Sequence, residues 1–272
     1  MIEILKAILF GIVQGITEWL PISSTGHMII LEEFLKLNVT PEFWEMFLVV
    51  IQLASIIAVV VIYWKRLFPF YKDGEFKYDH QKTILWFKII VACIPAAIIG
   101  LLLDDWINEH FYNFVSVACA LIVFGIGFIL IERRNEHREP IINDVKDITY
   151  KYAIGIGLFQ VLAAVFPGTS RSGSTILGGI LLGASRTVAA EFTFFLAIPV
   201  MFGASLLKLM KFGFAFSGAE LAILLVGSIV SFVVSMIAIK FLLRYIKRND
   251  FKVFGYYRIA LGIILILYFL IR

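Results

Sequence analysis

Apolar residues fill most of the chain in long runs that are separated by short polar and charged segments. A helix needs about 20 mostly apolar residues to span a bilayer. Six runs reach that length, at residues 46–64, 85–103, 113–131, 189–210, 219–243 and 254–271. The pattern predicts an all-α membrane protein with six spanning helices.

Two further apolar runs are interrupted in the middle. Residues 4–36 contain the segment PISSTGH at 21–27, and residues 152–183 contain PGTSRSGST at 167–175. Each half is too short to span a bilayer alone. Irregular backbone at membrane depth is tolerated only where protein or water surrounds it. We therefore expect two re-entrant helix–loop–helix segments that meet near the midplane.

Composition supports a membrane protein and orients it. The chain is 61% hydrophobic and 16% charged, whereas a soluble domain carries roughly a quarter charged residues. Basic residues gather in the predicted loops at 65–84, 132–151 and 244–252, whereas the loop predicted at 104–112, on the outer side, has no Lys or Arg. Because the basic residues lie between the apolar runs, we attribute them to the orientation of the protein in the membrane and not to nucleic-acid binding. The positive-inside rule then places the three basic loops in the cytoplasm. The first interrupted run then enters from outside and the second from inside.

The two interrupted runs also share residues. At an offset of 146 positions, Gly11 matches Gly157, Gln14 matches Gln160, Pro21 matches Pro167 and Ser24 matches Ser170. Weak internal similarity with opposite entry sides is typical of an inverted-topology repeat, whose functional site lies where the broken helices meet. We expect one membrane domain, 1–272, with repeats at about 1–131 and 147–272.

The first interruption carries candidate reactive groups. Gln14 and Glu18 are four residues apart and share a helix face. Polar residues follow in the break: Ser23, Ser24, Thr25 and His27. Carboxylate and imidazole groups inside a membrane segment are by default functional candidates. The alternatives are that Glu18 is a solvated helix end and that His27 is structural.

The second interruption has the composition of an anion site. Backbone amides at a helix N-terminus beside hydroxyls bind anions, and Arg171 adds a planar fork suited to phosphate oxygens. We expect the helix to resume at about Ser174. Candidate phosphate ligands from both interruptions are Ser23, Thr25, Gly168, Ser170, Arg171, Ser172, Gly173 and Thr175. Alternatively, Arg171 reaches a lipid headgroup or pairs structurally with Glu18 or Glu191.

Together the two interruptions suit phosphoryl transfer, which needs mainly positioning and charge neutralisation. Glu18 and Gln14 are candidate ligands for a loosely held divalent cation, Mg²⁺ or Ca²⁺. A lipid-phosphate or phosphate transporter that uses the same midplane anion site is the competing interpretation.

The order QGITE, PISSTGH and then PGTSRSGST resembles the undecaprenyl pyrophosphate phosphatase family, the bacitracin-resistance proteins of bacteria. The resemblance covers essentially the whole chain. It implies hydrolysis of the lipid undecaprenyl diphosphate with a divalent cation, in the cytoplasmic (inner) membrane, with an active site open to the outer, periplasmic side. Such an enzyme recycles the lipid carrier of cell-wall synthesis.

The resemblance also implies roles for particular residues. Glu18 corresponds to the essential acid, with Ser24, His27 and Arg171 at the reaction centre. Gln14 stands where a second carboxylate is common, and an amide cannot act as an acid or base. The nucleophile stays open between Ser24, His27 and water, and a homodimer is among the open oligomeric states.

Overall fold

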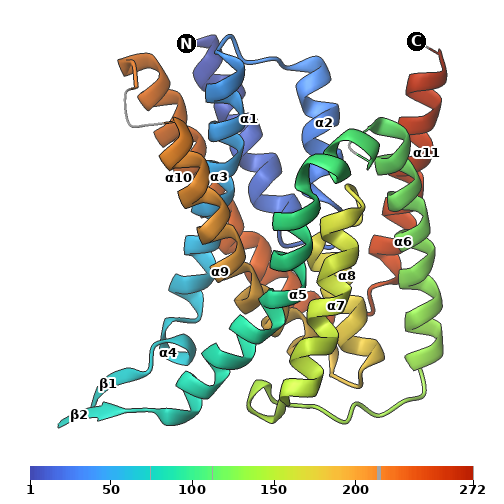
Figure 1. Cartoon of the computed structure of the whole chain (residues 1–272). Helices are drawn as coiled ribbons and strands as arrows, with labels where there is room; N and C mark the ends of the chain where they lie inside the picture. The colour runs from blue at the N-terminus through green and yellow to red at the C-terminus, as the bar shows by residue number, and fades with distance from the viewer. Residues whose placement is uncertain (74, 112, 213–215, 272) are drawn as a thin grey trace.

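The computed structural model describes residues 1–73, 75–111, 113–212 and 216–271, and these are almost entirely helical (Figure 1). The described residues include six helices that are long and apolar enough to cross a membrane. They are α3 (Pro41–Ile62), α5 (His80–Phe111), α6 (Phe114–Asn135), α9 (Arg186–Phe212), α10 (Gly218–Ile246) and α11 (Lys252–Ile271). The six predicted spanning helices are thereby confirmed.

Helix α5 is longer than the sequence analysis expected. A loop was expected at 104–112, but α5 continues to Phe111. Residues 104–111 include acidic side chains but neither proline nor glycine, so nothing in the local sequence stops the helix. Polar residues alone therefore do not end α5.

Each interrupted run forms two short helices. The first gives α1 (Ile2–Thr17) and α2 (Ser24–Phe34), and the second gives α7 (Tyr150–Val165) and α8 (Arg171–Leu181). The breaks are therefore shorter than the predicted loops. Because α8 begins at Arg171 and not at Ser174, the arginine lies in the first turn of a helix.

The two breaks end in the same local geometry. Ser23 and Ser170 have φ values of 74° and 68°, and they are the non-glycine residues with positive φ in the described chain. Each side chain caps the following helix by accepting a hydrogen bond from the amide three residues on, Gly26 and Gly173 respectively. Ser170 is thus equivalent to Ser23 and not to Ser24, because the second break has one more residue between its proline and its serine.

Small elements complete the end of the bundle that lies away from the chain termini. They are α4 (Trp64–Leu67), the antiparallel strands β1 (Phe70–Asp73) and β2 (Glu75–Tyr78), and the 3₁₀-helix η1 (Val145–Asp147). Figure 1 shows this hairpin at the lower end of the bundle and both termini at the upper end.

The helices pack in pairs around α8. Helix α1 lies on α10, α6 on α11, α5 on α7, and α3 on both α9 and α10. Helix α8 is buried along almost its whole length and contacts α6, α7 and α9. The polar start of α8 is therefore surrounded by other helices of the protein.

Helices α6 and α11 approach so closely that their backbones touch. A Cβ added to Gly125 would lie 2.8 Å from the carbonyl oxygen of Gly255, and a Cβ added to Gly255 would lie 2.7 Å from that of Gly125. Small residues at a helix interface allow such close contact in membranes.

We expect Gly125→Ala to separate α6 from α11 and lower the free energy of unfolding by about 1–3 kcal/mol, as overpacking does. Thermal unfolding of the purified protein in detergent measures the effect. Gly100→Ala is the matched control, because a Cβ on Gly100 meets nothing within 4 Å. Equal melting temperatures for the two variants would contradict the close contact.

Candidate active site

Glu18 lies just after α1 and is the centre of a buried hydrogen-bond network. Its side chain is 4% exposed. Its Oε2 accepts hydrogen bonds from Gln14 Nε2 at 2.9 Å, Ser24 Oγ at 3.2 Å and Gln52 Nε2 at 3.3 Å. Its Oε1 accepts from Arg171 Nη2 at 2.7 Å. The solvated helix end that the sequence left open does not describe this carboxylate.

Arg171 connects the second break to the first. Besides its ion pair with Glu18, it donates to the Thr193 carbonyl at 3.5 Å and contacts Met201 Sδ at 3.4 Å. Its side chain is 14% exposed. The structure therefore realises the pairing with Glu18 that was one alternative, whereas Glu191 pairs with Arg66. A guanidinium held this way keeps its planar fork beside the adjoining cavity.

A cavity of about 350 Å³ lies between the two breaks. The first break contributes Glu18, Ser24 and Thr25 to its wall, and the second contributes Gly168, Ser170, Arg171 and Ser172. Helices α3, α5 and α9 complete the wall with Gln52, Ile107, Val200, Met201 and Ala204. Residues about 150 positions apart thus face one polar space enclosed by apolar helices.

The serines of the second break join its backbone to the first break. Ser170 Oγ lies 3.1 Å from Ser172 Oγ, which in turn donates to the carbonyl oxygen of Glu18 at 3.3 Å. Thr175 lies one turn further along α8 and is fully buried. It donates to the Arg171 carbonyl at 2.8 Å and accepts from the Thr193 hydroxyl at 2.9 Å. Thr175 is outside the cavity wall and ties α8 to α9.

Other residues predicted to bind phosphate have structural contacts. Ser23 is buried and caps α2. Gly168 has a φ of +92°, and a Cβ there would lie 2.6 Å from the carbonyl oxygen of Val117. A Cβ on Gly173 would lie 2.7 Å from Arg258 Nη1. The absence of a side chain at these two glycines therefore makes room for the Val117 carbonyl group and the Arg258 guanidinium.

His27 points away from the Glu18 network. Its Nδ1 lies 2.7 Å from the Ser23 carbonyl, and its Nε2 lies 2.7 Å from the hydroxyl of Tyr257, on whose ring it stacks. A carbonyl can only accept, so Nδ1 carries a proton, and in the neutral ring Nε2 accepts from the tyrosine. His27 is outside the cavity wall. The structure thus brings Ser24, but not His27, to the carboxylate.

Arg258, on α11, is a residue that sequence reasoning missed. It is fully buried, and its guanidinium donates to the Pro21 carbonyl at 3.3 Å, the Gly168 carbonyl at 3.0 Å and the Thr169 carbonyl at 2.6 Å. One side chain therefore holds the backbones of both breaks. Charged residues are rare inside apolar membrane segments and usually have a functional or structural role. The sequence YYRIALG, which contains Arg258 within an apolar run, was therefore an indication that could have been used.

Comparison with known proteins identifies the family of this chain. The family model described as bacitracin resistance protein BacA matches residues 7–264. The chain belongs to the BacA family. An undecaprenyl-diphosphatase of Desulfitobacterium hafniense is 63% identical over 100% of this chain and 98% of its own length. A second undecaprenyl-diphosphatase, from Acetivibrio thermocellus, is 61% identical over 99% of this chain and 99% of its own length. A third, from Enterococcus faecalis, is 60% identical over 97% of both chains.

In this BacA-family chain, Glu18 and Gln14 do not form a ready metal site. The described residues contain no group of three or more His, Cys, Asp or Glu side chains that could hold a metal ion. Gln14 turns its amide nitrogen toward Glu18, and Arg171 places a positive charge on the other carboxylate oxygen. Nitrogen donors on both oxygens leave Glu18 poorly placed as a preformed cation ligand.

We expect Arg258→Met to leave three buried carbonyl groups without their donor and to lower stability by about 2 kcal/mol or more. Thermal unfolding in detergent measures the loss. Arg248→Met is the matched control, because Arg248 is exposed and lies in the turn before α11. If both variants melt at the wild-type temperature, Arg258 does not hold the two breaks.

Proposed function

We propose that this protein hydrolyses undecaprenyl diphosphate to undecaprenyl phosphate and inorganic phosphate. The observation that carries the proposal is the Glu18–Arg171 pair, which joins both breaks at one polar cavity. The undecaprenyl-diphosphatases that match nearly the whole chain support the same reaction. The enzyme is thus a membrane phosphoric anhydride hydrolase that recycles the lipid carrier of peptidoglycan synthesis and gives bacitracin resistance.

Arg171 is the group that binds the terminal phosphoryl oxygens. A diphosphate entering the cavity offers the guanidinium more negative charge than Glu18 does, so the arginine moves part of its bonding to the substrate. Ser170 and Ser172 lie on the same wall and offer hydroxyl donors. Donors fixed before the reaction stabilise the charge that spreads over the transferred group.

Ser24 is the nucleophile that the geometry favours. Its hydroxyl already donates to Glu18 Oε2, and both residues line the cavity. Glu18 takes the hydroxyl proton as Ser24 Oγ bonds to the terminal phosphorus, and the phosphoanhydride bond breaks to release undecaprenyl phosphate. Glu18 passes this proton to the oxygen of the departing undecaprenyl phosphate and is a carboxylate again. It then takes a proton from water, which attacks the phosphoserine, and returns that proton to Ser24 Oγ as inorganic phosphate leaves. His27 acts in this scheme through Tyr257 and Ser23 and not as the attacking group.

The proposed reaction also uses a loosely bound divalent cation, Mg²⁺ or Ca²⁺, which would bind the oxygens of the diphosphate. The cation would enter with the substrate, because the contacts of Glu18 leave no preformed site. Neutralising the diphosphate charge is the chemistry that such an ion supplies.

The fold we propose is an inverted-topology repeat with two re-entrant segments. The shared capping geometry at Ser23 and Ser170 supports it, as does the arrangement in Figure 1, where α1 begins at the upper end and α7 at the lower end. The cavity wall includes Ile107, near the upper end of α5. Since the basic hairpin region lies at the lower end, the site opens to the outer side of the bacterial cytoplasmic membrane.

We expect Arg171→Lys to lower kcat by at least about 10²-fold, because an ammonium can keep the charge near Glu18 but cannot reproduce the planar fork. Phosphate release from undecaprenyl diphosphate by purified protein in detergent measures the change. Arg134→Lys, at the end of α6, is the control with the same chemical substitution away from the cavity. Wild-type turnover by Arg171→Lys would contradict the phosphoryl-binding role.

The same assay distinguishes hydrolysis from transport. A carrier would move the lipid headgroup in liposomes without releasing phosphate from the purified protein. Absence of phosphate release by the wild-type protein at any cation concentration would overturn the proposed reaction itself.

Gln14→Glu would place a second carboxylate one helical turn from Glu18. We expect the concentration of Mg²⁺ that gives half-maximal activity to fall several-fold, since cation affinity rises with ligand charge. A titration of phosphate release against Mg²⁺ measures it, with Gln160→Glu as the repeat-related control. An unchanged titration would show that the cation does not approach this side of Glu18.

A further inference from the structure

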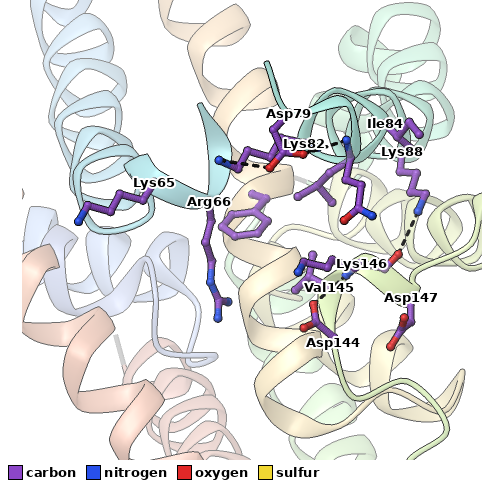
Figure 2. A pocket seen from close by; sticks show the side chains of 13 residues that line it. Lys65, Arg66, Asp79, Lys82, Ile84, Lys88, Asp144, Val145, Lys146 and Asp147 are labelled. Atoms are coloured by element: carbon purple, nitrogen blue, oxygen red, sulfur yellow. Dashed lines mark hydrogen bonds and ion pairs between the residues drawn. The ribbon is translucent and has the colours of Figure 1, made fainter. Parts of the chain in front are cut away.

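A second, larger cavity lies near the hairpin end of the molecule, away from the candidate active site. It occupies about 640 Å³ where α4, the start of α5 and η1 meet (Figure 2). Five basic side chains line it: Lys65, Arg66, Lys82, Lys88 and Lys146. We propose that this cavity binds the phosphate group of an anionic membrane lipid.

Three of the five cations are not committed to carboxylates. In the part of the chain that the structure describes, Arg66 pairs with Glu191 and Lys82 with Asp79. Lys88 Nζ donates to a neutral acceptor, the backbone carbonyl of Lys146, at 3.3 Å, as Figure 2 shows. Lys88 and Lys146 therefore bring positive charge to the cavity that an anion can neutralise, whereas the side chain of Lys65 extends away from them (Figure 2).

The acidic residues of the wall do not cancel this charge. Asp79, Asp144 and Asp147 line the cavity, and Glu191 neutralises Arg66, so four acids oppose the five cations. Asp79 is already the partner of Lys82, and Asp144 accepts a hydrogen bond from the backbone amide of Lys146 at the start of η1. An excess of positive charge remains in a partly enclosed space.

The inner side of the cavity is apolar. Leu85, Val145 and Phe195 form it and are 9%, 6% and 0% exposed. Because these side chains are already buried by protein, charge is the main attraction that the cavity offers to a ligand.

The neighbouring hairpin places the cavity at the depth of the lipid headgroups. Five aromatic side chains of α4 and the hairpin region are 41–51% exposed: Trp64, Phe68, Phe70, Tyr71 and Tyr78. Exposed aromatic residues next to lysines are typical of the membrane–water interface. Helix α3, a candidate membrane span, ends at Ile62 immediately before them. A membrane lipid is therefore the phosphate source within reach.

Replacing two of the free cations tests the proposal. Lys88→Gln/Lys146→Gln removes two charges with little change in shape, and Arg133→Gln/Arg134→Gln removes two charges from the end of α6, outside the cavity wall. Native mass spectrometry would compare retention of phosphatidylglycerol and phosphatidylcholine by each protein. We expect the cavity variant to lose phosphatidylglycerol affinity about tenfold, while the control variant and wild type retain it equally.

Two further measurements make the result decisive. Phosphatidylglycerol should raise the melting temperature of the wild type more than that of the cavity variant, because a ligand of the folded state stabilises it. Inorganic phosphate, which the proposed active site also binds, should raise the melting temperatures of both proteins equally. A phosphate effect that is lost in the cavity variant would overturn the lipid assignment, and equal phosphatidylglycerol retention by the cavity and control variants would overturn the site. If the double variant does not fold, Lys146→Gln alone takes its place with the same expected direction.

Discussion

A buried ion pair between Glu18 and Arg171 is the constraint on which the arrangement of this protein depends. Removing a carboxylate and a guanidinium from water costs several kcal/mol per ion, and only good geometry with further hydrogen bonds offsets it. Here Gln14, Ser24 and Gln52 supply those bonds to Glu18. Because the two charges come from different breaks, neither break can move away without leaving an unpaired buried charge.

Arg258 extends the same constraint from side chains to backbone. Its guanidinium joins carbonyl groups of both breaks, and Gly173 leaves room for it. Two arginines on different helices thus perform separate tasks. Arg258 holds the loops together from the side of α11. In the proposed reaction Arg171 exchanges part of its bonding with Glu18 for bonding with the substrate, and Arg258 would hold the two breaks while it does so.

Much of this could be predicted from the sequence, because spans and interruptions follow from the length of apolar runs. The six helices and the two polar breaks were found in that way. The starts of α2 and α8 were not, since a serine with positive φ that caps a helix has no distinct pattern in a polar segment. The direction of His27 was also beyond reach, because Tyr257 lies 230 positions away and only the folded chain brings the rings together. Arg258 did leave a signal, a charge inside an apolar run, which the emphasis on the two breaks obscured.

The hydrogen bond from Ser24 to Glu18 separates catalysis from carriage more clearly than the anion site does. An inverted repeat with an arginine at its centre would serve a transporter equally well, because binding an anion needs only donors and charge. A carrier gains nothing from a hydroxyl held against a buried carboxylate, and burying that carboxylate is costly. A hydrolase gains a nucleophile and a base in contact before substrate arrives, so that no reorganisation is needed during attack. The proposed reaction therefore accounts for the burial of Glu18 beside Ser24, whereas anion binding alone does not.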